Sequence, residues 1–213
     1  DVCAQLASFE DLPIAGSLIT PPYYVRPSQQ GIVEFYKEIA AATKTPLIVY
    51  DVPYRTGVQM ELETLRRLAD IPAVCAIKDC GGDARKTQAL IADRRLSVLS
   101  GEDHLIFSTI AQGGAGAIAA SAHLHPGLFV EMYRALNAGE IERARAIHHS
   151  LAAMIEALFE ESNPVPLKSV LGELGRGHGV VRKPLLAASP RVAKRAREEY
   201  EAVASLSNLF SRA

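Results

Sequence analysis

Short apolar runs bounded by turn residues recur through the first 120 positions of the chain. Each run is followed by a polar loop and then by apolar residues at helical spacing, such as Val33, Tyr36 and Ile39 after the first run. Apolar runs without alternation are typical of parallel strands that helices cover on both faces. The pattern therefore predicts an α/β protein. The predicted strands are residues 14–19, 46–50, 73–77, 96–99 and 115–120.

The periodicity changes beyond Pro126, where the strand pattern stops and helical periodicity continues. Gly139 is a typical helix stop, and no helix could cross the Ser-Asn-Pro-Val-Pro segment at 162–166 intact. We therefore expect a barrel or sheet portion at residues 1–139 and a C-terminal helical domain at residues 140–213. The predicted helices are residues 127–138, 141–161, 166–174 and 190–206.

Five consecutive βα units fit two architectures, an open doubly wound sheet or part of a closed barrel. The periodicity alone does not choose between them. Both architectures place their chemistry at the carboxyl ends of the strands, so the residues that follow each predicted strand are the first to inspect.

The composition excludes several classes of partner. Of the 213 residues, 48% are hydrophobic, and 23 basic against 24 acidic residues give a net charge of -1 without long runs of either sign. Nucleic acid and anionic membranes both need a concentrated basic surface, so we expect neither as a partner. No apolar run reaches the roughly 18 residues of a membrane span, and the start of the chain does not resemble a signal peptide. These features predict a cytoplasmic protein.

The potential metal and disulfide ligands are few and scattered. An odd number of cysteines, Cys3, Cys75 and Cys80, predicts reduced thiols rather than a disulfide framework or a zinc site. His123 and His125 flank a predicted strand end, but no carboxylate or cysteine stands at ligand spacing from them. We therefore expect no metal.

The predicted strand ends bring a lysine, two tyrosines and an arginine to one rim. Apolar walls disfavour the charged form of an amine, so Lys78 at the end of its strand could attack a carbonyl as a neutral amine and form a Schiff base. The hydroxyl of Tyr50 could shuttle the proton that this reaction moves. Arg55 offers a planar fork that binds a carboxylate through two hydrogen bonds.

Each of these residues also has a purely structural interpretation. Lys78 could be a solvated surface group, Tyr50 a core residue with its hydroxyl at the edge, and Arg55 a surface ion-pair partner. Tyr23 and Tyr24, next to two prolines, could form a subunit contact, because exposed aromatic side chains are enriched at interfaces.

Six segments occur in a fixed order along the chain: "PPYYVRPSQQG", "YDVPYRTGV", "AIKDCGGD", "LSGEDH", "GGAGAIAASA" and "ESNPVPLKSVLGELG". Together they resemble the dihydrodipicolinate synthase / N-acetylneuraminate lyase family of pyruvate-dependent aldolases, over nearly the whole chain to about Ser189. Within the family, the chain is most similar to the dihydrodipicolinate synthase branch. The resemblance implies a (β/α)8 TIM barrel with a C-terminal helical extension, assembled as a homotetramer, a dimer of dimers.

The resemblance also implies roles for individual residues. Lys78 matches the lysine that forms the Schiff base with pyruvate, so no separate cofactor is expected, and Tyr50 matches the tyrosine that passes protons to and from the imine. Tyr24 matches a second tyrosine, which in the family reaches into the neighbouring subunit's site. Arg55 resembles the arginine that receives the carboxylate of aspartate semialdehyde in lysine biosynthesis. The positions of Ile118 and Gly101 line the pyruvate pocket in the family.

The largest departure from the family is the lack of three βα units at the start. One of them carries a Gly-Thr-Thr-Gly-Glu motif that links the two tyrosines, and the threonines at 43, 45 and 56 do not match it. A barrel without three strands would leave two apolar edges open. We therefore expect an N-terminally incomplete chain. The alternative is a non-catalytic paralogue or fragment whose role is association.

Smaller departures concern the aldehyde. The segment "KDCGGD" is more similar to the lyase and sugar-acid aldolase branches, whereas Arg55 and "SNPVPLK" favour the synthase. A sugar-acid or 4-hydroxy-2-oxoglutarate aldolase is therefore the alternative enzyme. Asp51 stands where the family usually has asparagine, and we expect its carboxylate near a site meant for anions.

Overall fold

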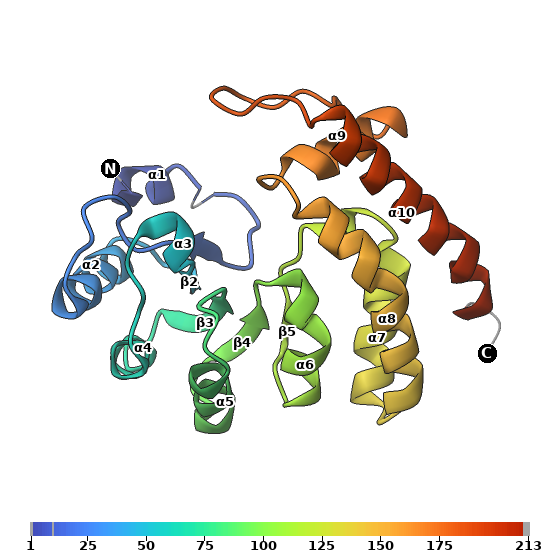
Figure 1. Cartoon of the computed structure of the whole chain (residues 1–213). Coiled ribbons are helices and arrows are strands. Elements are labelled where there is room, and N and C mark those ends of the chain that lie inside the picture. The colour runs from blue at the N-terminus through green and yellow to red at the C-terminus, as the bar shows by residue number, and fades with distance from the viewer. Residues whose placement is uncertain (1, 10, 211–213) are drawn as a thin grey trace. The chain divides into compact units, whose positions relative to one another are not determined.

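Five parallel strands form one sheet in the N-terminal part of the chain (Figure 1). The structure, a computed structural model, describes residues 2–9 and 11–210, with side chains as far as residue 205. The strands lie in the order β1-β2-β3-β4-β5, without the reversal that a doubly wound sheet has at its switch point. Each strand therefore follows its predecessor as in a barrel wall. They are β1 Ser17–Ile19, β2 Leu47–Asp51, β3 Val74–Asp79, β4 Ser97–Ser100 and β5 Gly116–Ala117.

The α/β class and the five predicted strands are confirmed, but the first and last strands are shorter than predicted. The segment before Ser17 turns, with the Ile14 amide donating to the Leu12 carbonyl at 2.8 Å. At the other end, the amide of Ile118 donates to the Ser100 carbonyl at 2.9 Å, and a 3-10 helix begins at Ser121. Apolar runs thus predicted where the strands lie better than where they end.

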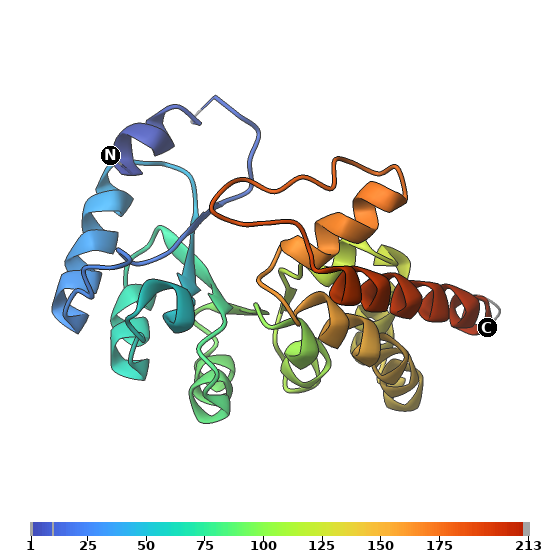
Figure 2. The same cartoon turned by 45° about the horizontal axis from the view of Figure 1, so that its top comes forward.

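The chain divides into two compact units. The first contains the described residues up to Glu102 together with Thr109–Ile118. In this unit α2, α4 and α5 follow one another along the sheet (Figures 1 and 2). The helices before β5 are α1 Val2–Ala7, α2 Gln29–Ala41, α3 Pro53–Thr56, α4 Leu62–Ala69, α5 Ala84–Asp93 and α6 Ile106–Ala111, with the 3-10 helix η1 Asp103–Leu105 before α6.

Local chemistry explains where these helices begin. The hydroxyl of Ser28 accepts from the Gly31 amide at 3.1 Å and caps α2. Asp83 caps α5 by accepting from the amides of Arg85 and Lys86. Only residues 80–83 separate β3 from α5, so this cap ends the short loop that carries Cys80. Ile32 and Tyr36 of α2 and Leu65 and Leu68 of α4 are buried in one core cluster with Ile77 of β3.

The register of β2, β3 and β4 aligns their carboxyl ends. Tyr50 lies beside Lys78, and Asp51 lies beside Asp79, which in turn lies beside Ser100. Successive residues of a strand point to opposite faces of the sheet. Tyr50 and Lys78 therefore share one face, and Asp51 and Asp79 share the other.

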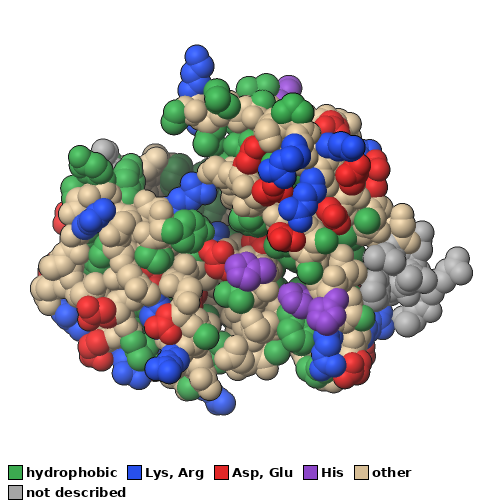
Figure 3. Space-filling model, in the orientation of Figure 1, with side chains coloured by type: hydrophobic (Ala, Val, Ile, Leu, Met, Phe, Trp, Pro, Cys, Tyr) green, Lys and Arg blue, Asp and Glu red, His purple; other side chains and the backbone are tan. Residues whose placement is uncertain are grey.

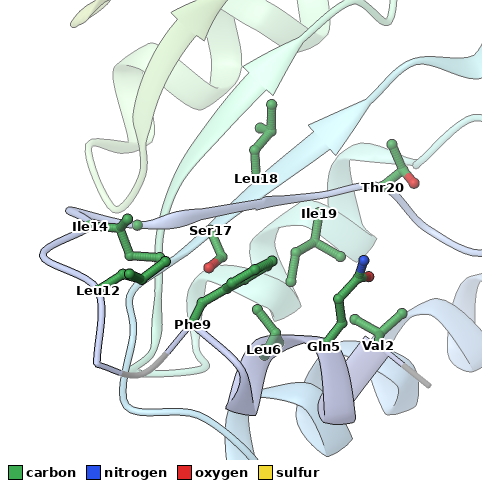
Figure 4. A pocket seen from close by; sticks show the side chains of 11 residues that line it. Val2, Gln5, Leu6, Phe9, Leu12, Ile14, Ser17, Leu18, Ile19 and Thr20 are labelled. Carbon is green, nitrogen blue, oxygen red and sulfur yellow. The ribbon is translucent and has the colours of Figure 1, made fainter.

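Both edges of the described sheet are open. Among the described residues, β1 pairs only with β2, and β5 pairs only with β4. A pocket of about 470 Å³ lies beside β1, between that strand and α1 (Figure 4). Its apolar lining side chains are Val2, Leu6, Phe9, Leu12, Ile14, Leu18 and Ile19.

The second unit is helical and contains Asp103–Ser108 together with the described residues from Ala119 on. Helices α7 and α8 pack against each other, and α10 packs on α8 and α9. Arg195 of α10 donates to Glu156 at 3.0 Å and to Glu160 at 2.8 Å. Acidic and basic side chains are intermixed on the face that Figure 3 shows. The elements are η2 Ser121–His123, α7 Pro126–Asn137, α8 Ile141–Leu158, α9 Val165–Glu173 and α10 Pro190–Phe210.

The four predicted C-terminal helices are present, with ends that differ by a few residues. The largest difference at a helix end is at α10, which continues to Phe210 rather than ending at 206, and α8 stops at Leu158 rather than at 161. The domain boundary at 139/140 stays a prediction. No helix among the described residues is long and apolar enough to cross a bilayer.

Candidate active site

Lys78 and Tyr50 form the centre of the site at the carboxyl end of the sheet. They are neighbours in the β2–β3 register, and the Nζ atom of Lys78 lies 4.4 Å from the centroid of the Tyr50 ring. Both side chains are half-buried. Among the described residues, no carboxylate forms an ion pair with Lys78. The amine thus faces an aromatic ring at a strand end instead of a counter-charge.

Gly101 brings the end of β4 directly against this lysine. Its amide donates to the Asp79 carbonyl at 2.9 Å, which continues the sheet beyond Ser100. A Cβ atom on Gly101 would lie 2.9 Å from Cγ and 3.0 Å from Cε of Lys78, and it would overlap the Cys80 sulfur. Only glycine allows this close approach, and it holds Lys78 and Cys80 beside each other.

Three further polar side chains lie near Tyr50 at the same rim. The buried thiol of Cys80 and the carboxylate of Glu102 both act on the pKa of Tyr50. The Tyr54 hydroxyl donates to Oε1 of Glu102 at 2.9 Å. Cys80, Glu102 and Tyr54 thus add polar groups to the rim around Tyr50 and Lys78.

Burial keeps Tyr50, Cys80 and Tyr54 protonated at neutral pH. Burial, followed by the effect of Cys80 and Glu102, raises the pKa of Tyr50 well above its usual range, and the nearby Arg55 opposes this only in part. Burial and the Glu102 carboxylate raise the pKa of the Cys80 thiol to about 12. Burial and the hydrogen bond to Glu102 raise the pKa of Tyr54. All three groups therefore carry their protons and can act as donors.

The opposite face of the same strand ends holds a buried ion pair. Nζ of Lys86 in α5 lies 2.5 Å from Oδ2 of Asp51 and donates to the Met60 carbonyl at 3.1 Å. Asp79 accepts from Thr87 Oγ1 at 2.5 Å and from the Gly81 amide at 2.8 Å. The expectation that Asp51 adds a carboxylate to the site is therefore wrong. Its position in the alternation turns it away from Tyr50, and Lys86 binds it.

Arg55, Ile118 and Tyr24 differ in their relation to this centre. Arg55 lies in α3, with Cζ 5.8 Å from the Tyr54 ring centroid, and its charge acts on Tyr50. Ile118 follows β5 and is half-buried. Tyr24 is 88% exposed and has a positive φ of 70°, and its amide donates to the Thr56 carbonyl at 3.2 Å. Within this chain, the structure does not bring Tyr24 to Lys78.

The comparisons with known proteins agree with this geometry. The family pattern described as "Dihydrodipicolinate synthetase family" matches residues 4–204. The chain belongs to this family. The resemblance inferred from the six segments is therefore confirmed.

Individual relatives of this family member agree with the assignment. A 4-hydroxy-tetrahydrodipicolinate synthase of Moorella thermoacetica is 40% identical over 198 residues, which cover 92% of this chain and 65% of the relative. A dihydrodipicolinate synthase structure from Thermotoga maritima has a TM-score of 0.90 and 31% identity, covering 95% of this chain and 70% of that one. One from Acinetobacter baumannii, described as complexed with pyruvate, has a TM-score of 0.90 and 33% identity, with the same coverage.

The chain is shorter than these family members and spans about two thirds of their length. Its described part matches their fold, so its five parallel strands correspond to strands of a TIM barrel. Analysis of the sequence did not identify Cys80, Glu102 and Tyr54 as members of the rim. Cys80 had a detectable signal, because it stands two residues after Lys78 and so shares its face. Among the described residues, no cluster of histidine, cysteine, aspartate and glutamate side chains could hold a metal ion.

Proposed function

We propose that this chain acts as a Schiff-base lyase that condenses pyruvate with an aldehyde through Lys78. The observation that carries the proposal is the Lys78 amine, 4.4 Å from the Tyr50 ring centroid, at a strand end without a carboxylate partner among the described residues. An amine without a counter-ion is free to act as a nucleophile towards a ketone. The Acinetobacter baumannii relative, which is described as complexed with pyruvate, supports the choice of keto acid.

The reaction proceeds in four steps that the rim residues can serve. The neutral amine of Lys78 attacks the ketone carbon of pyruvate, and the carbinolamine loses water with proton transfer through Tyr50. The iminium then loses a methyl proton to give an enamine. The enamine carbon attacks the aldehyde, and hydrolysis or cyclisation releases Lys78. Gly101 and Ile118, which follow β4 and β5, line the pocket for pyruvate.

Aspartate semialdehyde is the aldehyde that we propose, which makes the activity that of a 4-hydroxy-tetrahydrodipicolinate synthase in lysine biosynthesis. Arg55 supports this choice, because its guanidinium stands near enough to act on Tyr50 and can bind a second carboxylate bidentately. The Moorella thermoacetica relative bears that name.

Tyr24 supports a homo-oligomeric enzyme, a dimer of dimers. Its side chain is 88% exposed and stands next to Tyr23, which is 71% exposed. Exposed aromatic side chains of this kind are typical of interfaces. We propose that Tyr24 completes the proton relay in the neighbouring subunit.

An aldehyde screen tests the substrate. Turnover of pyruvate with aspartate semialdehyde is compared with turnover with glyoxylate and with sugar-acid aldehydes, in the unaltered chain and in Arg55→Ala. We expect Arg55→Ala to lose about 100-fold in kcat/KM with aspartate semialdehyde, as the loss of a charged bidentate contact predicts. Arg85→Ala, a substitution on the exposed part of α5, is the matched control.

Equal turnover with sugar-acid aldehydes or glyoxylate would favour the alternative enzyme, a sugar-acid or 4-hydroxy-2-oxoglutarate aldolase. The "KDCGGD" segment is the sequence feature that favours this alternative. The non-catalytic alternative makes a different prediction. With pyruvate and borohydride, a lyase gains a stable secondary amine on its lysine, whereas a folded association module gains none.

A further inference from the structure

We propose that Gln29 is a positioning residue for Arg55 and thereby helps to select the aldehyde. This inference rests on the proposed function, in which Arg55 binds the carboxylate of aspartate semialdehyde. Gln29 acts through residues 59–61, the segment that follows the short helix carrying Arg55.

Arg55 stands on a helix that is too short to hold its own direction. α3 spans only the four residues Pro53–Thr56, and a helix of about one turn is not stable by itself. It ends at Gly57, which has a φ of 79° and donates its amide to the Pro53 carbonyl at 2.8 Å. The direction of Arg55 therefore depends on what fixes the chain on either side of α3, which is β2 before it and residues 59–61 after it.

Gln29 uses its whole side-chain amide to bind this segment. Its Nε2 atom donates to the Gln59 carbonyl at 2.9 Å, and its Oε1 atom accepts from the Glu61 amide at 3.0 Å. The same oxygen accepts from the buried hydroxyl of Thr64 in α4 at 2.6 Å. Donor and acceptor of the amide are thus both used, and the backbone is fixed on both sides of Met60.

Met60 is held from another direction, by the end of β2 and by α5. Its amide donates to Oδ1 of Asp51 at 3.4 Å, and its carbonyl accepts from Nζ of Lys86 at 3.1 Å. Asp51 directly follows Tyr50 in β2. Residues 59 and 61 therefore bind Gln29, while the residue between them is tied to the strand that carries Tyr50.

The loop before Gln29 contacts the end of α3 as well. The Tyr24 amide donates to the Thr56 carbonyl at 3.2 Å. A Cβ atom on Gly57 would lie 3.1 Å from Nε of Arg26, so the Arg26 side chain passes directly beside the end of α3. The start of α2 and the loop before it are thus joined both to α3 and to the segment that follows it.

Loss of the Gln29 contacts should affect Arg55 more than Lys78. Lys78 and Tyr50 are set side by side by the register of β2 and β3, whereas the three hydrogen bonds of Gln29 described above go to residues 59–61 and to α4. A displacement of about 1 Å in a positioned group can cost about 100-fold in rate. The aldehyde step should therefore suffer, and Schiff-base formation with pyruvate should not.

The test compares Gln29→Met with Gln30→Met, the same substitution at the next position of α2. Methionine matches the length of glutamine but forms none of these hydrogen bonds, and Gln30 is exposed and binds Glu34 and Arg67 instead. We expect Gln29→Met to raise the KM for aspartate semialdehyde about 10-fold. The KM for pyruvate and the rate of borohydride trapping of pyruvate on Lys78 should stay within about twofold. Gln30→Met should keep all of these values.

Two further variants show whether the effect passes through Arg55. Gln29→Glu keeps the acceptor oxygen and loses only the donation to the Gln59 carbonyl, so we expect a smaller rise in the aldehyde KM, of about threefold. It also carries the comparison if Gln29→Met does not fold. Adding Gln29→Met to Arg55→Ala should raise the aldehyde KM no further than Arg55→Ala alone, because both substitutions weaken one contact.

Three results would overturn the positioning role and leave the lyase proposal intact. They are an unchanged aldehyde KM in the folded Gln29 variants, a further rise when Gln29→Met is added to Arg55→Ala, and an equal rise in the KM for both substrates. Absence of both trapping and turnover in the unaltered chain and in Gln30→Met would overturn the proposed function, and the role of Gln29 with it.

Discussion

Two lysines of one βα unit, Lys78 and Lys86, serve opposite purposes at the end of the same strand. Lys86 is 5% exposed and its ammonium lies 2.5 Å from a carboxylate oxygen of Asp51. Lys78 is half-buried, faces the Tyr50 ring and has no ion-pair partner among the described residues. The comparison teaches that the partner, more than burial, separates a structural lysine from a chemically available one. A buried carboxylate engages one ammonium in an ion pair, whereas no carboxylate among the described residues occupies the other.

The largest difference is expected when Lys78 is removed. Lys78→Ala should reduce pyruvate-dependent turnover to background, because every covalent step needs its nitrogen. Its free energy of unfolding should change by less than about 1 kcal/mol, since no ion pair is lost. Turnover assays and urea unfolding measure the two quantities. A variant that keeps turnover would show that another nucleophile acts.

The opposite outcome is expected for Lys86→Met. This substitution leaves Asp51 buried without its counter-ion, which should lower the free energy of unfolding by about 3–5 kcal/mol. In the folded protein, burial already raises the pKa of Asp51, and loss of Lys86 should raise it further. Stability is then retained below the unfolded-state pKa and lost as the pH rises through the folded-state pKa.

Urea unfolding of Lys86→Met at pH 5 and pH 8 checks the sign of this effect. We expect the variant to be more stable at the lower pH and the double variant Asp51→Asn, Lys86→Met to lose this dependence. Equal stability of the single variant at both values would contradict the buried pair.

Tyr50 and Tyr36 give a second comparison between a reactive and a structural residue, with smaller expected effects. Tyr50→Phe should slow Schiff-base formation about 100-fold through the loss of its proton transfer, with little effect on stability. Tyr36 is fully buried and donates to the Ile19 carbonyl at 2.6 Å. Tyr36→Phe should therefore lower the free energy of unfolding by about 1–2 kcal/mol. It should not change the trapping rate, which is the rate at which borohydride reduction fixes pyruvate on Lys78. A trapping rate that fell equally in both variants would remove the distinction.

The smallest effect is expected at the C-terminal helices. Hydrogen bonds from Arg195 and Arg191 lower the pKa of Glu160. This contribution to stability is present above the unfolded-state pKa and is lost as the pH falls through the folded-state pKa. Acid unfolding followed by circular dichroism should show a midpoint that moves to higher pH in Arg195→Gln. The difference should shrink at high salt, because exposed ion pairs are screened.

The strands and the Lys78–Tyr50 pair were accessible from the sequence because both depend on local periodicity. The apolar runs before Tyr50 and Lys78 place the two residues at the ends of neighbouring strands. The parallel register of these strands then sets the two residues side by side. The length of β1 was less accessible, since the turn at Ile14 depends on backbone hydrogen bonds that hydropathy does not encode.

The pairing of Asp51 with Lys86 could not be predicted from local patterns. The two residues are 35 positions apart, and their contact depends on how α5 packs over the end of β2. The expectation from the sequence put Asp51 near the site; strand alternation was the signal against this, but it does not show which cation Asp51 meets. The same holds for Glu102 and Tyr54, which are 48 positions apart and meet only through the sheet.

The most direct test is to locate the adduct after reduction of the chain with borohydride in the presence of pyruvate. Peptide mass mapping after trypsin digestion can separate the two lysines. Trypsin cleaves after Arg85, so Lys78 and Lys86 fall in different peptides. We predict a stable adduct on Lys78 and an unmodified Lys86. An adduct on Lys86, or equal modification of both lysines, would contradict the assignment of Lys78 as the reactive amine.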